Sequence, residues 1–209
     1  MTTSTTKRPE GSLPPRRSAG TVATSVPNIL TYLRIAAVPA MVACFFLIKP
    51  PMSNWLAVSL FIAAAITDFF DGYLARAWSQ QSALGRMLDP IADKLLVAVC
   101  LLLLVEQGII GGWSTWAAAV ILCREILVSG LREFLAELRV SVPVTRLAKW
   151  KTTLQMIAIG ILLSGQAGRA IYDGMLIVGL GCLWISAIVT LYTGYDYFRA
   201  GVHHLIEEK

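Results

Sequence analysis

Six apolar runs along this chain of 209 residues are long enough to cross a lipid bilayer as α-helices. A hydrocarbon core of about 30 Å needs about 20 helical residues, with a range of roughly 17 to 25. The runs lie near residues 29–48, 55–75, 90–106, 114–131, 152–168 and 174–196. Hydrophobic residues make up 56% of the chain and charged residues 15%, which argues against an ordinary soluble domain. The sequence therefore predicts an all-α, polytopic membrane protein with six transmembrane helices.

The Lys and Arg residues beside these runs predict the orientation of the chain. They gather before the first run, between the second and third, and between the fourth and fifth, at Lys7, Arg8, Arg16, Arg17, Arg76, Arg86, Arg132, Arg139, Arg146, Lys149 and Lys151. The opposite connections carry only Lys49 and Arg169. Because basic residues favour cytoplasmic loops, both termini are expected in the cytoplasm. The net charge of +5 then suits anionic lipid headgroups, and no nucleic-acid partner is expected.

The chain divides into three segments by composition. Residues 1–25 are rich in Thr, Ser, Pro and Arg without apolar periodicity, which predicts a disordered cytoplasmic leader. Residues 26–201 carry the six runs and form one expected domain, and residues 202–209 form a short polar tail.

Four aspartates lie at or beside the second and third apolar runs. Asp68 and Asp71 end the second run, and Asp89 and Asp93 begin the third. Since residues three or four apart share a helix face, each pair is expected to project together from its helix. Four such carboxylates repel one another unless cations neutralise them, and Mg²⁺ or Mn²⁺ prefers oxygen ligands of this kind. The spacing therefore predicts a site for metal ions and phosphates on the cytoplasmic side.

Interfacial salt bridges are the alternative explanation, with Arg76, Arg86 and Lys94 as the nearest basic partners along the chain. Convergence of four acids favours a functional site, because ionisable groups in a membrane are costly. Gly72 and Gly85 add to this, since a residue without a side chain lets a ligand approach the backbone closely.

The whole pattern, Asp68-x2-Asp71-Gly72-x2-Ala75-Arg76-x8-Gly85-x3-Asp89-x3-Asp93, resembles the signature of the CDP-alcohol phosphatidyltransferases at every defining position. The resemblance implies an enzyme that moves a phosphatidyl group from a CDP-linked lipid to an alcohol and releases CMP. It implies that the first three aspartates hold divalent metal, two ions in all, and that Asp93 joins the metal site and acts as base. The remaining matched positions are expected to contact the CDP-lipid together with Asp71: Gly72, Ala75, Arg76 and Gly85.

The first predicted helix adds further candidates for the CDP-lipid site, namely Asn28, Thr31 and Arg34. Capping of that helix by Asn28 or Thr31, or anchoring at the membrane interface, explains these residues nearly as well.

Flanking segments resemble the bacterial phosphatidylglycerophosphate synthases within that family, over roughly residues 27–200. The matching segments are 27–34, 67–72, 87–94, 124–133 and 149–156. This resemblance implies CDP-diacylglycerol and glycerol 3-phosphate as substrates, a bacterial cytoplasmic (inner) membrane location and a homodimer. An anionic acceptor needs cations, and Arg124, Lys149 and Lys151 are the predicted phosphate ligands. The alternatives are that Glu125 or another carboxylate neutralises Arg124, and that the lysines anchor their helix by snorkelling.

Two other functions stay open. One is an enzyme of the same family with another acceptor, such as a cardiolipin synthase or a phosphatidylinositol phosphate synthase. The other is a divalent cation transporter, although a transporter would be expected to carry acids through the membrane depth rather than at one face.

Overall fold

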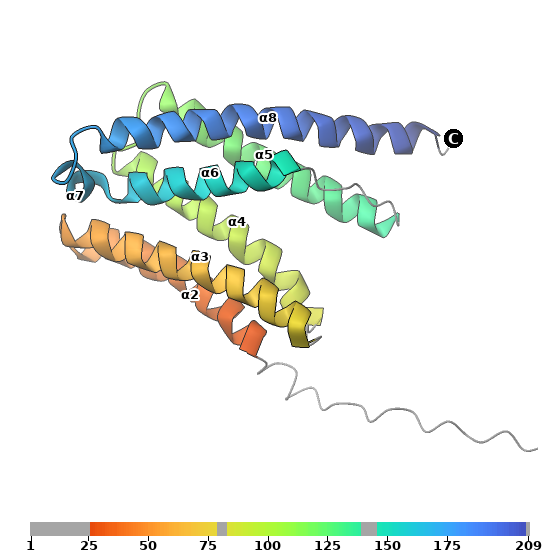
Figure 1. The fold of residues 1–209 in the computed structure, drawn as a ribbon, viewed down its shortest axis with the longest axis horizontal. Helices are drawn as coiled ribbons and strands as arrows, with labels where there is room; N and C mark the ends of the chain where they lie inside the picture. The colour runs from red at the N-terminus through yellow and green to blue at the C-terminus, as the bar shows by residue number, and fades with distance from the viewer. Residues whose placement is uncertain (1–25, 79–82, 139–145, 208–209) are drawn as a thin grey trace, which may run out of the picture.

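Every regular element in the described part of the chain is an α-helix (Figure 1). The computed structural model describes residues 26–78, 83–138 and 146–207. Its helices are α2 (Val26–Leu47), α3 (Met52–Trp78), α4 (Ala83–Glu106), α5 (Ser114–Glu137), α6 (Arg146–Leu163), α7 (Gly165–Arg169) and α8 (Met175–Glu207). The all-α prediction is confirmed. The predicted leader at 1–25 lies outside the described residues, and α8 continues through 202–207 of the predicted tail.

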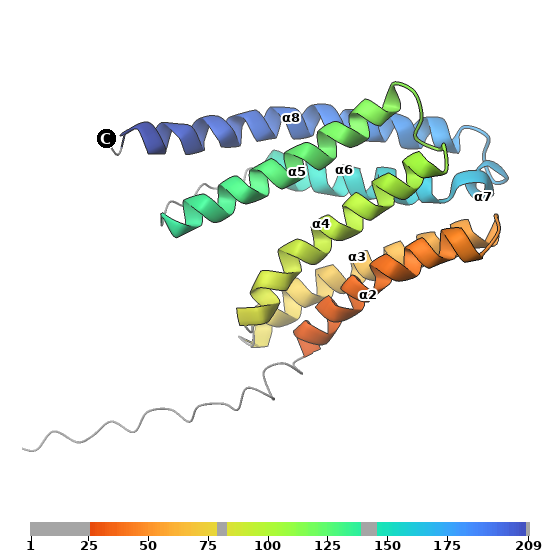
Figure 2. The ribbon, with the colours of Figure 1, turned by 180° about the vertical axis from the view of Figure 1, so that it is seen from behind.

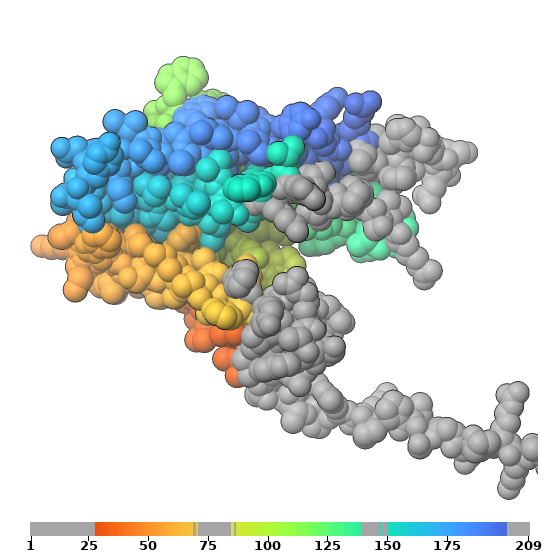
Figure 3. Space-filling view, viewed as in Figure 1, coloured from red at the N-terminus to blue at the C-terminus, as the bar shows by residue number. Residues whose placement is uncertain are grey.

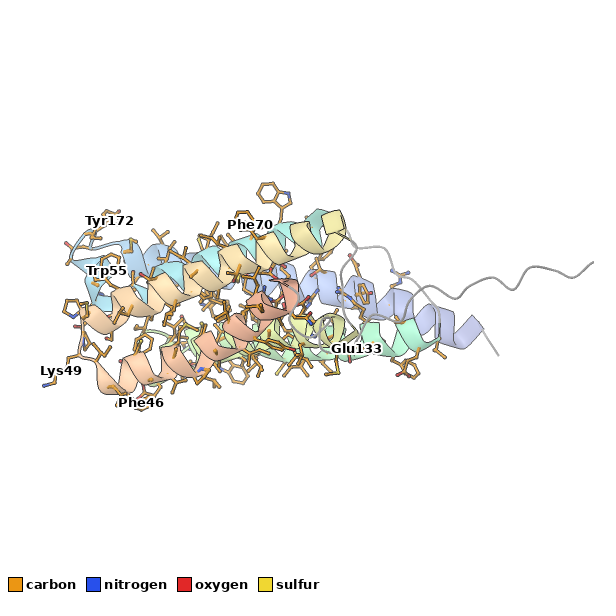
Figure 4. The ribbon with its side chains drawn as sticks, turned by 90° about the horizontal axis from the view of Figure 1, so that it is seen from below. Phe46, Lys49, Trp55, Phe70, Glu133 and Tyr172 are labelled. Atoms are coloured by element: carbon orange, nitrogen blue, oxygen red, sulfur yellow. The ribbon has the colours of Figure 1, made fainter. Side chains whose placement is uncertain are left out.

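The long helices alternate in direction along the chain (Figures 1 and 2). α6 and α8 lie side by side, α2 pairs with α3, and α4 crosses between α2 and α5. The N-terminal ends of α2, α4 and α6 therefore lie at the same end of the bundle as the C-terminal ends of α3, α5 and α8. Lys49 and Tyr172 lie at the opposite end of the bundle, whereas Glu133 lies toward the end that holds the start of α4 (Figure 4). We call the end with the start of α4 the charged end, because it carries the predicted site.

Three of the described helices contain segments long and apolar enough to cross a membrane: Asn28–Leu47, Ser114–Glu137 and Met175–Arg199. Shorter apolar stretches occupy Met52–Asp68 in α3 and Trp150–Leu163 in α6. Large apolar side chains also cover the outside of the bundle, with Leu47 82% exposed and Ile177 76% exposed. The helices thus fit a membrane protein, and the count of six spans stays a prediction.

Several predicted boundaries differ from the helix ends, most of all at the C-terminus of α8, which reaches Glu207 rather than 196. The third run was expected to begin at 90, but α4 begins seven residues earlier at Ala83, because Ala, Leu, Arg and Met favour helix even where the sequence is not continuously apolar. The fifth run was expected to reach 168, but α6 ends at Leu163. Gly165 has φ +48°, a left-handed conformation that ends a helix.

Candidate functional site

A buried arginine on α2 holds together acids from two other helices at the charged end. Arg34 Nη2 lies 3.1 Å from Asp68 Oδ1 on α3, and Arg34 Nη1 donates to Asp93 Oδ1 on α4 at 2.8 Å. The Arg34 side chain is 0% exposed, whereas those of Asp68 and Asp93 are 52% and 49% exposed. The guanidinium therefore forms the floor of the acid cluster, and the carboxylates remain accessible from outside.

Thr31 supports the same cluster from one turn earlier on α2. Its hydroxyl donates a short hydrogen bond to Asp89 Oδ1 on α4. Asn28, Thr31 and Arg34 are all buried and recur every three residues, so they form one polar stripe that faces into the bundle. The N-cap alternative for Asn28 and Thr31 was wrong, because α2 already includes Val26 and both residues lie inside the helix.

The basic partners predicted for the acids were Arg76, Arg86 and Lys94, but the partner that the structure shows is Arg34. Arg34 pairs with Asp68 and Asp93, although it is 59 residues from Asp93 in the chain. Lys94 instead donates to Ser129 Oγ on α5, which ties α4 to α5 beside the acid cluster. The signal for Arg34 was its place inside an apolar run, since a cation buried there requires a counter-charge.

Several predicted residues have side chains outside the described part of the structure. Asp71, Gly72, Ala75 and Arg76 lie on α3 beyond Asp68, and the path of the helix is all that is described for them. Gly85 is described and is buried in the first turn of α4.

The acid cluster fits a hard divalent cation by the chemistry of its donors. Among the described side chains, no group of three or more His, Cys, Asp or Glu residues is arranged to hold a metal ion, and that search does not include Asp71. Asp68, Asp89 and Asp93 nevertheless gather on one polar stripe of α2, and all three offer carboxylate oxygens. Oxygen donors of this kind suit Mg²⁺ or Mn²⁺.

A second polar cluster joins α5, α6 and α8. Lys151 on α6 is 4% exposed, and its Nζ donates to Glu125 Oε1 on α5. Arg124 Nη1 lies 3.6 Å from the same carboxylate oxygen. Glu125 is thus a shared counter-ion for two cations, as the alternative reading of Arg124 proposed. The snorkelling alternative for Lys151 was wrong, because its ammonium is buried and paired.

Sequence reasoning missed the residues of α8 that contact Arg124. Arg124 Nε donates to the Thr190 carbonyl oxygen at 3.1 Å, and Nη2 donates to Thr193 Oγ1 at 3.2 Å. Gly194 lies against the same side chain. Their only signal in the sequence is a Thr-x2-Thr-Gly pattern in an apolar run. Lys149 lies on α6, and its side chain is outside the described part.

Comparisons with known proteins cover most of the chain. The family model described as CDP-alcohol phosphatidyltransferase matches residues 24–192. A Cereibacter sphaeroides protein named CDP-diacylglycerol–glycerol-3-phosphate 3-phosphatidyltransferase is 42% identical, over 88% of this chain and 99% of its own length. Proteins of the same name from Rickettsia bellii and Pectobacterium atrosepticum are 48% and 40% identical. They align with 84% and 88% of this chain and with 94% and 98% of their own lengths.

Proposed function

Because this chain belongs to the CDP-alcohol phosphatidyltransferase family, we propose that it transfers a phosphatidyl group from CDP-diacylglycerol to glycerol 3-phosphate. The products are phosphatidylglycerophosphate and CMP. The names of near full-length relatives support this choice of substrates. The structural observation that supports it is that the bundle holds both an acid cluster, on α3 and α4, and a separate cation cluster, on α5 and α6.

The acid cluster would carry out the phosphoryl chemistry. Asp68, Asp71, Asp89 and Asp93 would hold two Mg²⁺ or Mn²⁺ ions, which when bound neutralise the diphosphate of the CDP-lipid. The 1-hydroxyl oxygen of glycerol 3-phosphate forms the new bond to the lipid-side phosphorus. Its proton passes to the Asp93 carboxylate, and the bond from that phosphorus to CMP breaks. Asp93 stays accessible for this role, since its side chain is 49% exposed although Oδ1 accepts a bond from Arg34.

Contacts to the CDP-lipid are proposed for the rest of the pattern and for the polar stripe of α2. They are Asp71, Gly72, Ala75, Arg76, Gly85, Asn28, Thr31 and Arg34. For Thr31 and Arg34 the structure adds a second role, because both side chains fix acids of the cluster.

The cation cluster would bind the phosphate of the acceptor. Arg124, Lys149 and Lys151 supply positive charge, of which Glu125 neutralises only one equivalent among the described groups. A dianionic phosphate therefore gains by entering this cluster, whereas a neutral hydroxyl acceptor would not need it. Replacing both lysines by methionine should raise the KM for glycerol 3-phosphate, and an unchanged KM would remove the support for this acceptor.

An apolar groove between α3 and α6 suits an acyl chain of the lipid substrate. Its volume is about 680 Å³, within the range of ligand pockets, and its lining runs from Phe61 through Ala65 to Phe70 on α3 and along Gly160 on α6. Figure 3 shows these two helices side by side on one face. Phe70 lies two residues beyond Asp68 on α3, so the groove ends at the level of the acid cluster along the helix, although the two side chains leave opposite sides of α3.

The membrane arrangement belongs to the same proposal. Six transmembrane helices with both termini in the cytoplasm would place the charged end, and the active site, at the cytoplasmic face of a bacterial inner membrane. The alternating direction of the six long helices and the positions of the basic residues support this orientation. A homodimer is proposed from the family resemblance alone.

The proposal is tested with purified protein, CDP-diacylglycerol, Mg²⁺ or Mn²⁺, and a panel of acceptors, with CMP release as the readout. We expect glycerol 3-phosphate to be the preferred acceptor, and Asp93→Asn to reduce turnover at least about 100-fold. Asp173→Asn is the matched control, because Asp173 is exposed between α7 and α8. If the Asp93→Asn variant turned over at the wild-type rate, Asp93 would be rejected as the base.

Other outcomes of the assay would replace the proposed function. Preference for phosphatidylglycerol would indicate a cardiolipin synthase, and preference for inositol phosphate would indicate a phosphatidylinositol phosphate synthase. Metal uptake into protein-loaded vesicles without CMP release would indicate a transporter.

A further inference from the structure

The guanidinium of Arg124 is held from one side by the middle of α8. Its Nε donates to the Thr190 carbonyl oxygen at 3.1 Å and its Nη2 donates to Thr193 Oγ1 at 3.2 Å. Thr190 is 0% exposed and Thr193 is 6% exposed, so both acceptors lie inside the bundle. Two hydrogen bonds from different nitrogens fix the plane of the guanidinium as well as its position.

The Thr193 hydroxyl is itself oriented for this contact. Its hydrogen can point back along α8, because the Val189 carbonyl oxygen lies 2.9 Å away and the Thr190 carbonyl oxygen 3.2 Å away. A hydroxyl that donates to its own helix keeps its lone pairs for an outside donor. Thr193 can therefore accept from Arg124 without losing a bond of its own.

Gly194 provides the space in which the Arg124 side chain lies. A Cβ atom at this position would lie 3.1 Å from Arg124 Cγ and 3.3 Å from Arg124 Nε, which is closer than ordinary packing allows. Gly194 is buried, and the helix around it is regular. Any side chain here would push the stem of Arg124 away from α8, and the guanidinium would move with it.

The two bonds to α8 leave the Nη1 end of the guanidinium for another partner. Of the described groups, Glu125 is the one that approaches Nη1, and its oxygen is 3.6 Å away, beyond good hydrogen-bonding distance. The same Glu125 oxygen already accepts from Lys151. The Nη1 hydrogens and the Lys151 ammonium therefore both face Glu125 Oε1, and an acceptor phosphate takes bonds from both cations by displacing that carboxylate.

From this geometry we infer that Thr193 and Gly194 are positioning residues for the acceptor subsite, acting through Arg124. They hold the guanidinium so that its Nη1 end meets the phosphate of glycerol 3-phosphate. This inference rests on the proposed function, and it adds α8 to the helices that determine acceptor affinity. Neither residue touches the reacting atoms, so the effect of replacing them should fall on acceptor binding.

Gly194→Ala and Thr193→Val test the inference through the KM values of the two substrates. A misplacement of a binding group by a fraction of an ångström is expected to raise the KM for glycerol 3-phosphate about tenfold. The KM for CDP-diacylglycerol should change less than about twofold, because Arg124 does not serve that substrate. Gly181→Ala is the matched control on the same helix, since a Cβ there meets nothing within 4 Å.

Further variants separate positioning from a purely structural role. Thr193→Ser keeps the hydroxyl and should restore the KM for glycerol 3-phosphate, whereas Thr193→Val keeps the shape and should not. In an Arg124→Ala background, Gly194→Ala should have no further effect on this KM, because its action passes through Arg124. Equal rises in both KM values, or a Gly194→Ala variant that matches Gly181→Ala, would overturn the inference.

The same experiment distinguishes this inference from the proposed function. If the wild type does not use glycerol 3-phosphate, the proposed function fails. If the wild type does use it and Arg124→Ala raises its KM, but Gly194→Ala and Thr193→Val do not, the positioning role alone fails.

Discussion

Replacing Arg34 by methionine should destabilise the bundle, because it removes a guanidinium that joins α2, α3 and α4 at the acid cluster. Arg34 contacts Asp68 at 3.1 Å and Asp93 at 2.8 Å, and its side chain is 0% exposed. Methionine keeps similar length and apolar packing but carries no charge. The two carboxylates then lose the counter-charge that Arg34 supplies.

The size of the effect follows from the exposure of the partners. A hydrogen bond to a charged group contributes about 1.5–3 kcal/mol, so two would contribute about 3–6 kcal/mol if all partners were buried. Asp68 and Asp93 are 52% and 49% exposed, so water can solvate both carboxylates after the change. Roughly half of the lost interaction free energy is therefore recovered. The expected loss is about 1.5–3 kcal/mol, which for a chain of this size lowers Tm by roughly 3–12 °C.

Thermal unfolding of purified protein in detergent, without added metal, measures this loss. Arg169→Met is the matched control, because Arg169 is exposed at the end of α7. Arg34→Lys should be intermediate, since one ammonium cannot bridge two carboxylates as a guanidinium does. Added Mg²⁺ should raise the Tm of Arg34→Met more than that of the wild type. If Arg34→Met and Arg169→Met melt together, the stabilising role of Arg34 is wrong.

Three further predictions concern the helix junction, the lipid groove and the metal. Gly165→Ala should lower the free energy of unfolding by about 2–4 kcal/mol, because φ is +48° and the new Cβ would lie 2.5 Å from Asn54 Nδ2. Gly111→Ala is the control, and equal Tm values for the two variants would contradict the prediction. Ala65→Trp should slow turnover of long-chain CDP-diacylglycerol severalfold, because the indole would fill the groove. Ala63→Trp is the control, because Ala63 is exposed. Equal turnover by the two variants would exclude the groove as the acyl site. Chelation with EDTA should abolish CMP release, with recovery on adding Mg²⁺ or Mn²⁺, and persistent activity would reject the metal requirement.

Features that depend on local sequence were predictable. The six apolar runs correspond to the six long helices, because helix formation depends on residues within a few turns of one another. The same locality explains two of the errors at helix ends. The run-based boundary at 90 ignored the helix-forming residues from Ala83 onward, and the boundary at 168 ignored the left-handed turn at Gly165.

By itself, the sequence determined the helical class, the spacing that puts Asp89 and Asp93 on one face of α4, and the pattern that marks the family. These follow from the 3.6-residue period of a helix and from residue chemistry. Only the tertiary structure decided that Arg34 joins Asp68 to Asp93, that Glu125 serves both Arg124 and Lys151, and that Gly194 makes room for Arg124. The reason is that a buried charge pairs with whichever group the packing brings within hydrogen-bonding distance. Asp68 and Asp93 reach Arg34 from other helices, and Glu125 reaches Lys151 from another helix while it also lies beside Arg124.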